Sequence, residues 1–398
     1  MPLNLLRHTS QLMWGTKSIS AALTENVQGV ETELWGRDEL ADVARETTGK
    51  PYNEEESAVI LLNSRARPGR ELRALASRKA PFAAVSAEGI VAARVNLRGV
   101  SPGVITIRTM SRILKEAPRL EVPAEMLHRG YWDLVNSNGL RIAEQAEHFG
   151  DSQSLPSTAK LSGPPSSLRI HGSAVVEDYV CFDARPGPIV VAEGASIESF
   201  SRISGPCYIG RRAKILSALV RGGSSIFDGC KVGGEVENSV LMQYTNKAHL
   251  GYVGDSYVGE WVNLGAGSTF SNLKNTYGNV RTEAGGARTD TGMVKLGPAI
   301  GDMSKVSIGA MVFAGKKVGS GSHVTGLAST DIPSFTYFDS VKGRAVEIRL
   351  ESVLETQRRM KERRGFTVSR AEEELIVSAF RRTASERKEA GVKKGRIV

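Results

Sequence analysis

The chain has 398 residues, of which 40% are hydrophobic and 24% charged, the composition of a soluble globular protein rather than of a disordered or membrane protein. At roughly 150 residues per domain this length predicts two to three domains, and no stretch approaches the ~18 consecutive apolar residues of a membrane span. Much of the net charge of +9 lies in residues 344–398, which hold fifteen Lys and Arg and nine Glu. Because these charges are mixed in sign, they predict a solvated helical tail and no nucleic-acid partner.

The cysteines and histidines carry little sign of metal chemistry. Cys181, Cys207 and Cys230 are an odd number with no C-x-x-C pair, which argues against a disulfide framework and a structural zinc site and favours a reducing cytoplasm. The histidines other than His249 are scattered without metal-ligand spacing, so we expect no metal site. The opening residues lack the basic-then-apolar order of a signal peptide, and we expect no membrane partner.

Residues 1–150 have the mixed pattern of an α/β domain. Two β-like apolar runs and three helical patterns occur there. The predicted strands are Ser57–Asn63 and Gly89–Leu97, and the predicted helices are Arg70–Lys79, Ser111–Ala117 and Leu140–Phe149. A Ser/Pro-rich stretch over residues 151–167 predicts a linker and the domain boundary.

The middle of the chain contains an internal repeat. Residues 187–326 hold 25 of the 42 glycines, and aliphatic residues recur there at a strict period of six. The first run is Val191, Ile197, Ile203, Ile209 and Ile215, and the second is Ile300, Val306, Val312, Val318 and Val324. Several are followed directly by glycine, and a looser version of the pattern (Val253-Gly254, Val258-Gly259, Leu264-Gly265) joins the two runs.

A period of six fits neither an α-helix nor an alternating strand. It fits a coil with three short flat faces, one inward aliphatic side chain on each face, and small residues at the corners. Such coils bury a continuous core only by stacking on one another, so the repeat predicts a parallel β-helix over residues 168–340. The aromatic content of 6% agrees, because a narrow prism has little room for large rings.

The last segment, residues 341–398, is predicted to be a basic helical tail. Val341–Arg364 is a charged helix candidate. Ser369-Arg370-Ala371-Glu372 is a capping-box signature that opens a second helix.

A polar segment interrupts the repeat and carries the candidate chemistry. Residues 246–279 read NKAHLGYVGDSYVGEWVNLGAGSTFSNLKNTYGN, and a polar excursion then continues to Met293. From CKVGGEV at Cys230 through this segment, and on through KLGPAIGDMSKVSIGAMVFAGKKVG to IPSF, the sequence resembles the acetyltransferase half of a bifunctional family. This family is the UDP-N-acetylglucosamine diphosphorylases/glucosamine-1-phosphate N-acetyltransferases, and the likeness is greatest to the branch with a divergent N-terminal sugar nucleotidyltransferase domain.

The resemblance implies a left-handed β-helix that assembles as a homotrimer, with active sites between neighbouring subunits and acetyl-CoA as the acetyl donor. It implies that His249 is the general base. Tyr252 and Asn272 match positions that hold the amino sugar phosphate or position the acetyl group. The resemblance further assigns Arg221 and Lys295 to the phosphate, Asn263 to the substrate, and Ala266 and Ser307 to the coenzyme. One departure is that Leu241, Met242 and Gln243 occupy the region between Arg221 and His249 where the family keeps a lysine.

The same residue types suit acyl transfer on physical grounds. The attacking amine must be neutral, because an ammonium has no lone pair. An imidazole, with an ordinary pKa of about 6.5, can take that proton near neutral pH, typically for ~10²–10⁴-fold in rate. An asparagine amide or a backbone N–H at a glycine-rich turn can stabilise the oxyanion, and arginine offers a bidentate grip on phosphate.

A fainter resemblance links residues 1–150 to the divergent nucleotidyltransferase domain. It rests on PLNLLRHTSQLMWG, on LLNSRA at residues 61–66, and on GYWDLVNSNGLRI with Asp133 and Asn138. The first strand of the family is missing, and Met13 replaces its usual second arginine. There is no glycine-rich phosphate loop followed by Pro-Lys and no convincing pair of Mg²⁺-binding carboxylates, although Arg7 and Lys17 are candidate nucleotide contacts.

Three hypotheses follow. The first is an acetyl-CoA-dependent N-acetyltransferase acting on an amino sugar 1-phosphate, such as glucosamine 1-phosphate, on the route to UDP-N-acetylglucosamine. The second is a sugar-1-phosphate nucleotidylyltransferase whose β-helix serves for trimerisation; only here would Mg²⁺ and a nucleoside triphosphate be needed. The third is a non-catalytic trimer that binds a sugar nucleotide. Release of free thiol, release of pyrophosphate, or binding without turnover distinguishes them.

Overall fold

The computed structural model describes residues 2–25, 27, 38–40, 42–43, 58–96, 114–150, 153–284 and 286–395. The chain divides into two compact units. One unit comprises Arg7–Leu12 and Lys17–Gly130, and the other comprises Met1–Leu6, Met13–Thr16 and Tyr131–Val398. The last boundary between the units along the chain is therefore Gly130/Tyr131, whereas the sequence pattern predicted residues 1–150 as one domain and 151–167 as a linker.

The unit of Lys17–Gly130 is built on a four-stranded sheet in the order β3-β5-β4-β6. Strand β3 pairs antiparallel with β5, and β4 pairs antiparallel with β5 and parallel with β6. The strands are β3 (Ala58–Leu62), β4 (Phe82–Ser86), β5 (Gly89–Asn96) and β6 (Arg119–Glu121), and the helices are α1 (Ile19–Thr24) and α3 (Arg70–Ala76). The two predicted strands and the helix from Arg70 are confirmed. Of the predicted helix Ser111–Ala117, the first three residues lie outside the described part of the chain.

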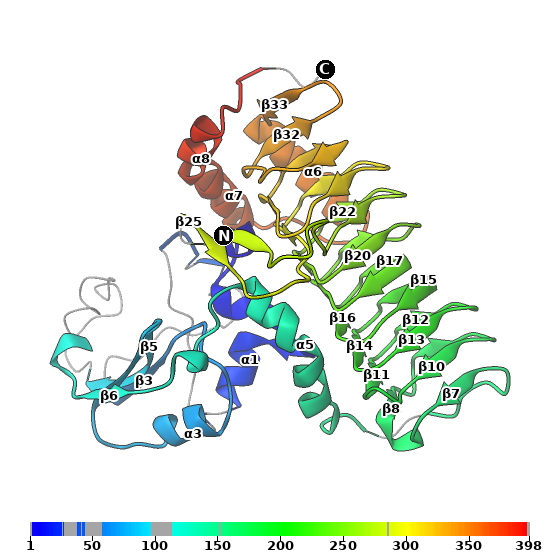
Figure 1. The fold of residues 1–398 in the computed structure, drawn as a ribbon, viewed down its shortest axis with the longest axis horizontal. Helices are drawn as coiled ribbons and strands as arrows, with labels where there is room; N and C mark the ends of the chain where they lie inside the picture. The colour runs from blue at the N-terminus through cyan, green and yellow to red at the C-terminus, as the bar shows by residue number, and fades with distance from the viewer. Residues whose placement is uncertain are drawn as a thin grey trace. The chain divides into compact units, whose positions relative to one another are not determined.

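The other unit contains the predicted parallel β-helix, whose coils stack as successive rungs (Figure 1). Each regular coil contributes short strands to three faces, which we call A, B and C. Face A is a parallel sheet of β8 (Leu168–Ile170), β11 (Ile189–Val191), β14 (Cys207–Ile209), β16 (Ser224–Ile226), β18 (Val240–Leu241), β21 (Tyr257–Val258), β26 (Ala299–Ile300) and β29 (Lys317–Val318).

Faces B and C share two long strands, β15 (Lys214–Val220) and β17 (Lys231–Glu237), which run through the corner between them. Face B also holds β9 (Val175–Val176), β12 (Ser196–Ile197), β19 (Asn246–Lys247), β22 (Asn263–Leu264), β27 (Lys305–Val306), β30 (His323–Thr325) and β32 (Thr336–Asp339). Face C holds β7 (Lys160–Ser162), β10 (Cys181–Asp183), β13 (Arg202–Ser204), β20 (Tyr252–Gly254), β23 (Thr269–Phe270), β28 (Met311–Val312) and β31 (Leu327–Ala328).

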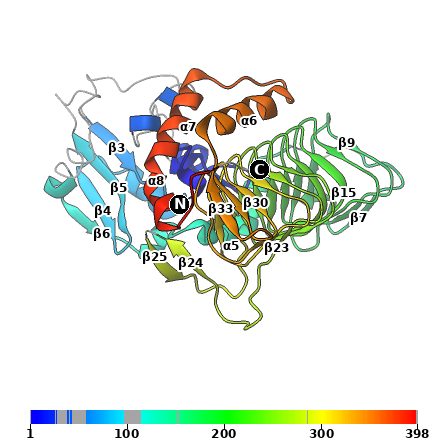
Figure 2. The same cartoon turned by 90° about the horizontal axis from the view of Figure 1, so that it is seen from above.

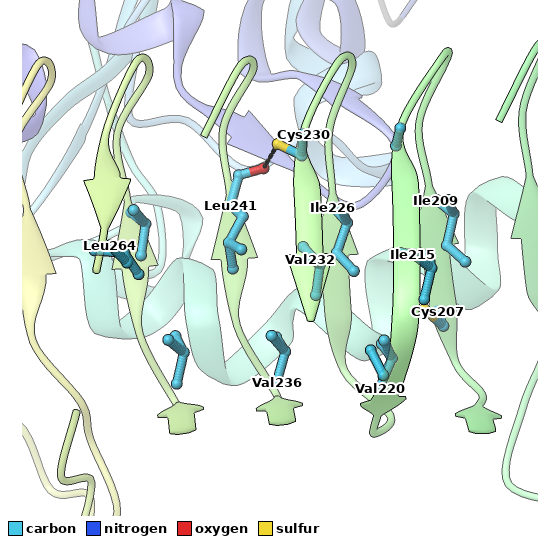
Figure 3. Packing of buried hydrophobic residues seen from close by; sticks show 14 of the residues in the cluster. Cys207, Ile209, Ile215, Val220, Ile226, Cys230, Val232, Val236, Leu241 and Leu264 are labelled. Atoms are coloured by element: carbon cyan, nitrogen blue, oxygen red, sulfur yellow. Dashed lines mark hydrogen bonds between the residues drawn. The ribbon is translucent and has the colours of Figure 1, made fainter. Parts of the chain in front are cut away.

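The period-six aliphatics form three inward ladders, one for each face. On face A, Ile209 pairs with Ile226, Ile226 with Leu241, and Leu241 with Val258. Figure 3 shows Ile209, Ile226 and Leu241 stacked from coil to coil inside the prism. Burying each such side chain contributes about 1.5–3 kcal/mol, so the repeat itself supplies the driving force for stacking. The fold class expected from the sequence, an α/β part, a parallel β-helix and C-terminal helices, is confirmed.

The predicted linker is only partly a linker. Its residues Lys160–Ser162 form β7, which pairs with Cys181–Asp183 of β10 as the first rung of face C. Leu161 packs against the core of the β-helix. The Ser/Pro-rich composition hid this strand because it is short and carries a single apolar residue.

Helix α5 (Tyr131–Ala146) packs against strands of face A. Its Asn138 is fully buried and donates from Nδ2 to the carbonyl of Gly223 at 2.8 Å and to the Ser225 hydroxyl at 2.9 Å. Its Oδ1 accepts from the Gly15 amide at 2.8 Å. The segment around Asn138 is therefore fixed to the β-helix, which is what a buried amide with all its groups satisfied requires.

The C-terminal segment is packed, not solvated. Residues Arg344–Glu347 form β33, antiparallel to β32, and α6 begins only at Leu350, so the predicted helix from Val341 was wrong in its first nine residues. A strand is favoured here because it covers the open edge left by the last coil. Ser369 caps the next helix with the predicted capping box. The helices are α6 (Leu350–Glu362), α7 (Arg370–Arg382) and α8 (Ala384–Glu389).

Helices α6 and α7 lie along one side of the β-helix (Figure 2), and their apolar residues pack against it. Val353, Ile376 and Ala379 join Trp261 and Phe335 in one buried cluster. The sequence-based expectation of a solvated tail was wrong because the apolar positions are sparse among many charges. In the described part of the chain, no helix is long and apolar enough to cross a membrane.

Candidate functional site

The candidate base lies on a projecting corner between faces B and C. The His249 turn (residues 249–251) joins β19 to β20, and both His249 and Leu250 are exposed. The Gly267 amide donates to the Leu250 carbonyl at 2.6 Å, and the Gly309 amide donates to the Ala266 carbonyl at 2.8 Å. Turns of successive coils thus stack at this corner, which places Ala266 one coil beyond the His249 turn.

Beside this turn, face C carries a hydrogen-bonded cluster that we call the Tyr252 network (Glu237, Asn238, Tyr252, Asp255 and Asn272). The Tyr252 hydroxyl donates to Glu237 Oε2 at 2.9 Å and accepts from Asn272 Nδ2 at 2.9 Å. Asn272 Nδ2 also donates to Asp255 Oδ2 at 2.5 Å, and Asn238 Nδ2 donates to Asp255 Oδ1 at 2.6 Å. The network therefore fixes the Tyr252 and Asn272 side chains from both sides.

The register of the coils explains why these residues meet. On face C, Glu235 pairs with Tyr252 and Tyr252 with Thr269 in neighbouring strands. Asn238 and Asp255 are 17 residues apart in the chain, as are Asp255 and Asn272. A coil of this length returns each position to the same place one rung further on. The sequence interpretation found Tyr252 and Asn272, but it missed Glu237, Asn238 and Asp255. A search at this spacing from Asn272 would have found Asp255 and Asn238, whereas Glu237 lies 15 residues from Tyr252.

The network is rich in carboxylates. Burial raises the pKa of Asp255, and the neighbouring Glu237 adds to this effect, while hydrogen bonds from Asn238 and Asn272 oppose it. Burial and the bond to Glu237 also raise the pKa of the Tyr252 phenol, so this group stays protonated and acts as a donor near neutral pH.

The two predicted phosphate-binding cations lie close to this network, and one of them is held in an ion pair. Arg221 Nε is 2.6 Å from Glu235 Oε1, and this pairing raises the pKa of Arg221. Lys295 forms an antiparallel bridge with Leu273 and is close enough to lower the pKa of Asp255 through its charge. Arg221 and Lys295 are thus brought to the same face as Tyr252.

The remaining predicted residues belong to face B and its corner. Asn263 Oδ1 accepts from Asn246 Nδ2 at 2.9 Å, and the Ser307 hydroxyl shares a 2.9 Å hydrogen bond with Thr325. Among the described residues, no hydrogen bond joins Asn263 or Ser307 to the Tyr252 network. Beyond Asn263 in register stands Lys305, whose ammonium donates to the Met303 carbonyl at 2.6 Å. Burial lowers the pKa of Lys305 to about 7.

Sequence reasoning also missed Lys247, which takes the place of an aliphatic residue in the inward ladder of face B. It pairs with Val232 in register and is only 1% exposed. Its ammonium donates to the carbonyls of Gly233 at 2.8 Å and His249 at 2.5 Å. Burial lowers its pKa to about 8. The signal was present as a polar residue at a period-six core position.

Beyond Asn272 the chain leaves the β-helix in an excursion that returns at Leu296. Its neck is closed by the Leu273–Lys295 bridge and by the Leu296 amide, which donates to the Asn272 carbonyl at 2.7 Å. Past the neck it forms a hairpin of β24 (Arg281–Ala284) and β25 (Ala287–Asp290), seen beside the β-helix in Figure 2. Within the described ranges, no group of three or more His, Cys, Asp or Glu is arranged to hold a metal ion.

The residues behind the N-terminal resemblance have structural partners. The Met13 carbonyl accepts from the Tyr257 hydroxyl at 2.8 Å, and Trp14 Nε1 donates to Ser137 at 3.1 Å. Lys17, a candidate nucleotide contact, lies 2.5 Å from Glu25. Together with the bonds of Asn138, these contacts account for the motifs around Met13 and Asn138 by packing against the β-helix.

Comparison with known proteins finds relatives of the family that the sequence resembles. The chain is 38% identical to the bifunctional protein GlmU of Jannaschia sp. (strain CCS1) over 102 residues, 25% of this chain and 22% of that protein. This chain resembles bifunctional GlmU proteins. It is also 35% identical over 86 residues, 22% of this chain and 21% of that protein, to the bifunctional sugar-1-phosphate nucleotidylyltransferase/acetyltransferase of Sulfurisphaera tokodaii. The family resemblance inferred from the sequence is thereby confirmed.

The likeness is partial. The chain spans less than a third of the length of these curated relatives. No family model matches it. Among solved structures, the UDP-N-acetylglucosamine acyltransferase of Francisella novicida aligns with a TM-score of 0.29 and 15% identity, over 61% of this chain and 95% of that chain.

Proposed function

We propose that this protein is a cytoplasmic, acetyl-CoA-dependent N-acetyltransferase that acts on an amino sugar 1-phosphate, with glucosamine 1-phosphate as substrate. The observation that carries the proposal is the His249 turn leading directly into the Tyr252 network. The relatives named as GlmU and as a nucleotidylyltransferase/acetyltransferase support the same chemistry. The three free cysteines support a reducing compartment.

In the proposed reaction the amine nitrogen attacks the thioester carbonyl of acetyl-CoA. A C–N bond forms, the C–S bond breaks, and CoA leaves as its thiolate. We assign to the His249 imidazole the removal of the amine proton, which then passes to the departing thiolate. An exposed imidazole at a projecting corner is accessible to a substrate that rests against the neighbouring network.

The charges around Tyr252 suit an amino sugar. Three carboxylates, those of Glu235, Glu237 and Asp255, outnumber the two cations of this face, Arg221 and Lys295, so this surface favours the substrate's ammonium group before it loses its proton. Tyr252 and Asn272 would hold the sugar, while Arg221 and Lys295 would face its phosphate. Asn263 would contact the substrate, and Ala266 and Ser307 would lie on the coenzyme side.

We also propose that the chain works as a homotrimer whose subunits meet at this corner. Large apolar side chains project there: Leu250 is 79% exposed and Ile308 is 78% exposed. Two exposed apolar residues of face C, Met311 and Leu327, lie in register beside it. Large exposed apolar side chains gathered at one corner favour contact with another protein surface.

The decisive experiment follows the release of free CoA thiol from acetyl-CoA in the presence of glucosamine 1-phosphate. Wild type is compared with His249→Ala and with His171→Ala, a control that removes another exposed histidine of the same β-helix. We expect turnover in wild type and in the control, and a loss of about 100-fold or more in His249→Ala. Equal turnover in all three would overturn the assignment of the base.

If no chain releases thiol with any of several amino sugar phosphates, the acetyltransferase proposal fails. Pyrophosphate release from a nucleoside triphosphate and sugar 1-phosphate would then support nucleotidylyl transfer, with Mg²⁺ required. Ligand-induced thermal shifts without either product would support a non-catalytic trimer that binds sugar nucleotides.

A further inference from the structure

The excursion beyond Asn272 contains a pocket of about 500 Å³ that no part of the proposed reaction uses. It lies past the neck of the excursion, and Lys274 on its wall is two residues from Asn272. Its lining is almost wholly charged or polar, and consists of Lys274, Asn279, Arg281, Arg288 and Asp290.

The hairpin places both arginines on one face of its two strands. Arg281 stands opposite Asp290, and Arg288 stands opposite Glu283. Residues two apart on one strand share a face, as Arg281 and Glu283 do, and residues directly opposite in an antiparallel pair also share a face, as Glu283 and Arg288 do. Both guanidinium groups therefore project from the same side.

The carboxylates that could neutralise these cations are only partly available. Glu283 turns to Lys317, whose ammonium lies 2.8 Å from Glu283 Oε2. Arg288, its cross-strand neighbour, has no ion-pair partner in the part of the chain that the structure describes. Asp290 is 3.8 Å from Arg281 Nε, a distance at which the pair is loose.

The pocket thus holds three cationic side chains against one carboxylate. Lys274 donates to the backbone carbonyl of Asn279, which holds its ammonium in place without neutralising it. A net charge of this size matches a phosphate group, which carries about −1.5 to −2 near neutral pH and accepts hydrogen bonds from guanidinium forks. A cluster of like charges without such a ligand would be destabilised by mutual repulsion.

We infer that the pocket formed by Lys274, Arg281 and Arg288 binds a phosphate group of a reactant. This inference rests on the proposed function for the identity of the reactant, but not for the binding of phosphate itself. Two reactants of the proposed reaction carry phosphate, namely the acyl-CoA and the sugar phosphate. The neck of the excursion connects the segment that carries the pocket to Asn272 of the Tyr252 network.

The first test uses inorganic diphosphate as the probe and needs no catalysis. Calorimetric titration compares the full-length wild type with Arg281→Gln/Arg288→Gln. The control Arg185→Gln/Arg202→Gln removes the same charge from two exposed arginines of face C and its corner. We expect the hairpin variant to bind diphosphate about tenfold more weakly and the control to match wild type. No loss, or an equal loss in both variants, would overturn the inference.

The second test identifies the reactant. KM is measured for wild type and for Arg281→Gln/Arg288→Gln. The CoA thioester is either acetyl-CoA or acetyl-dephospho-CoA, and the sugar is either glucosamine 1-phosphate or glucosamine. If KM for one reactant is roughly tenfold higher in the variant than in wild type, and the difference disappears when that reactant lacks its phosphate, the pocket binds the phosphate of that reactant. If neither KM changes, the pocket does not serve the reaction. If the chain has no acetyltransferase activity, the diphosphate titration still decides whether the pocket binds phosphate.

Discussion

The ammonium group of Lys247 donates a hydrogen bond to the backbone carbonyl of His249 over 2.5 Å, from inside the core of the β-helix. The same ammonium donates to Gly233 in the preceding coil. A corner that projects into solvent is therefore held from within by a buried cation. Such a cation destabilises the fold in exchange for fixing the backbone of the candidate base.

The free-energy cost of the buried ammonium leads to a prediction for Lys247→Met, a change that keeps a side chain of similar length and removes the charge. Burial lowers the pKa of Lys247 to about 8 in the folded chain, whereas an unfolded lysine titrates near 10.4. Between these values the unfolded state binds more protons, so the stability of wild type rises with pH. Relative to the variant, wild type should gain up to about 3 kcal/mol between pH 7.5 and 10.5. Urea unfolding of both proteins at the two pH values measures it, and parallel changes in stability would contradict it.

Tyr252→Phe tests the network beside His249. The change leaves the Glu237 carboxylate without its phenol donor and removes an acceptor from Asn272. We expect a loss of about 1–3 kcal/mol in the free energy of unfolding and a fall of about tenfold in kcat for thiol release. The control is Tyr277→Phe, because Tyr277 is 71% exposed in the excursion. A kcat unchanged from wild type would remove Tyr252 from the site.

Ile308→Asp tests the proposed trimer contact. Ile308 is 78% exposed at the corner that also carries Leu250, so a carboxylate there costs a monomer little but would be buried in a subunit interface. We expect wild type to have three times the mass of one chain by light scattering, and the variant to dissociate. Leu140→Asp, on an exposed position of α5, should leave the mass unchanged. A monomeric wild type would show the trimer proposal to be wrong.

Ile376→Ala tests the packing of the C-terminal helices. Ile376 is 4% exposed in the cluster that joins α7 to Trp261 and Phe335. Truncating a buried isoleucine to alanine should lower the free energy of unfolding by about 2–5 kcal/mol. Glu374→Ala, which removes only an exposed ion pair with Arg370, should cost less than about 1 kcal/mol. Denaturant unfolding compares the two variants, and equal effects would mean that the segment is solvated after all.

The sequence predicted the part of the fold that is built from repeats, namely the β-helix. Val191, Ile197 and Ile203 occupy faces A, B and C in turn, so a period of six states the geometry of the coil directly. The periodicity did not predict a strand where the strand contains only one apolar core residue. Leu161 in β7 and Val346 in β33 each lie in a polar context, and their strands exist because a neighbouring edge is available for pairing.

The candidate site was accessible only in part. His249, Tyr252 and Asn272 stand in a recognisable motif, whereas Asn238 and Asp255 are recognisable only once the coil length is known. Lys247 was hidden for a different reason. A lysine in a polar segment is ordinarily assigned to the surface, and only the three-dimensional ladder shows that its position belongs to the core.

The excursion between Asn272 and Leu296 leaves the β-helix without altering it. Val258 pairs with Ile300 on face A in the same parallel manner as Leu241 pairs with Val258, although far more chain separates the first two. The packing of the core therefore does not depend on the length or the sequence of the excursion. A lineage could lengthen, shorten or recharge this hairpin while every aliphatic rung stayed in place, so ligand preference and folding can evolve here under separate selection.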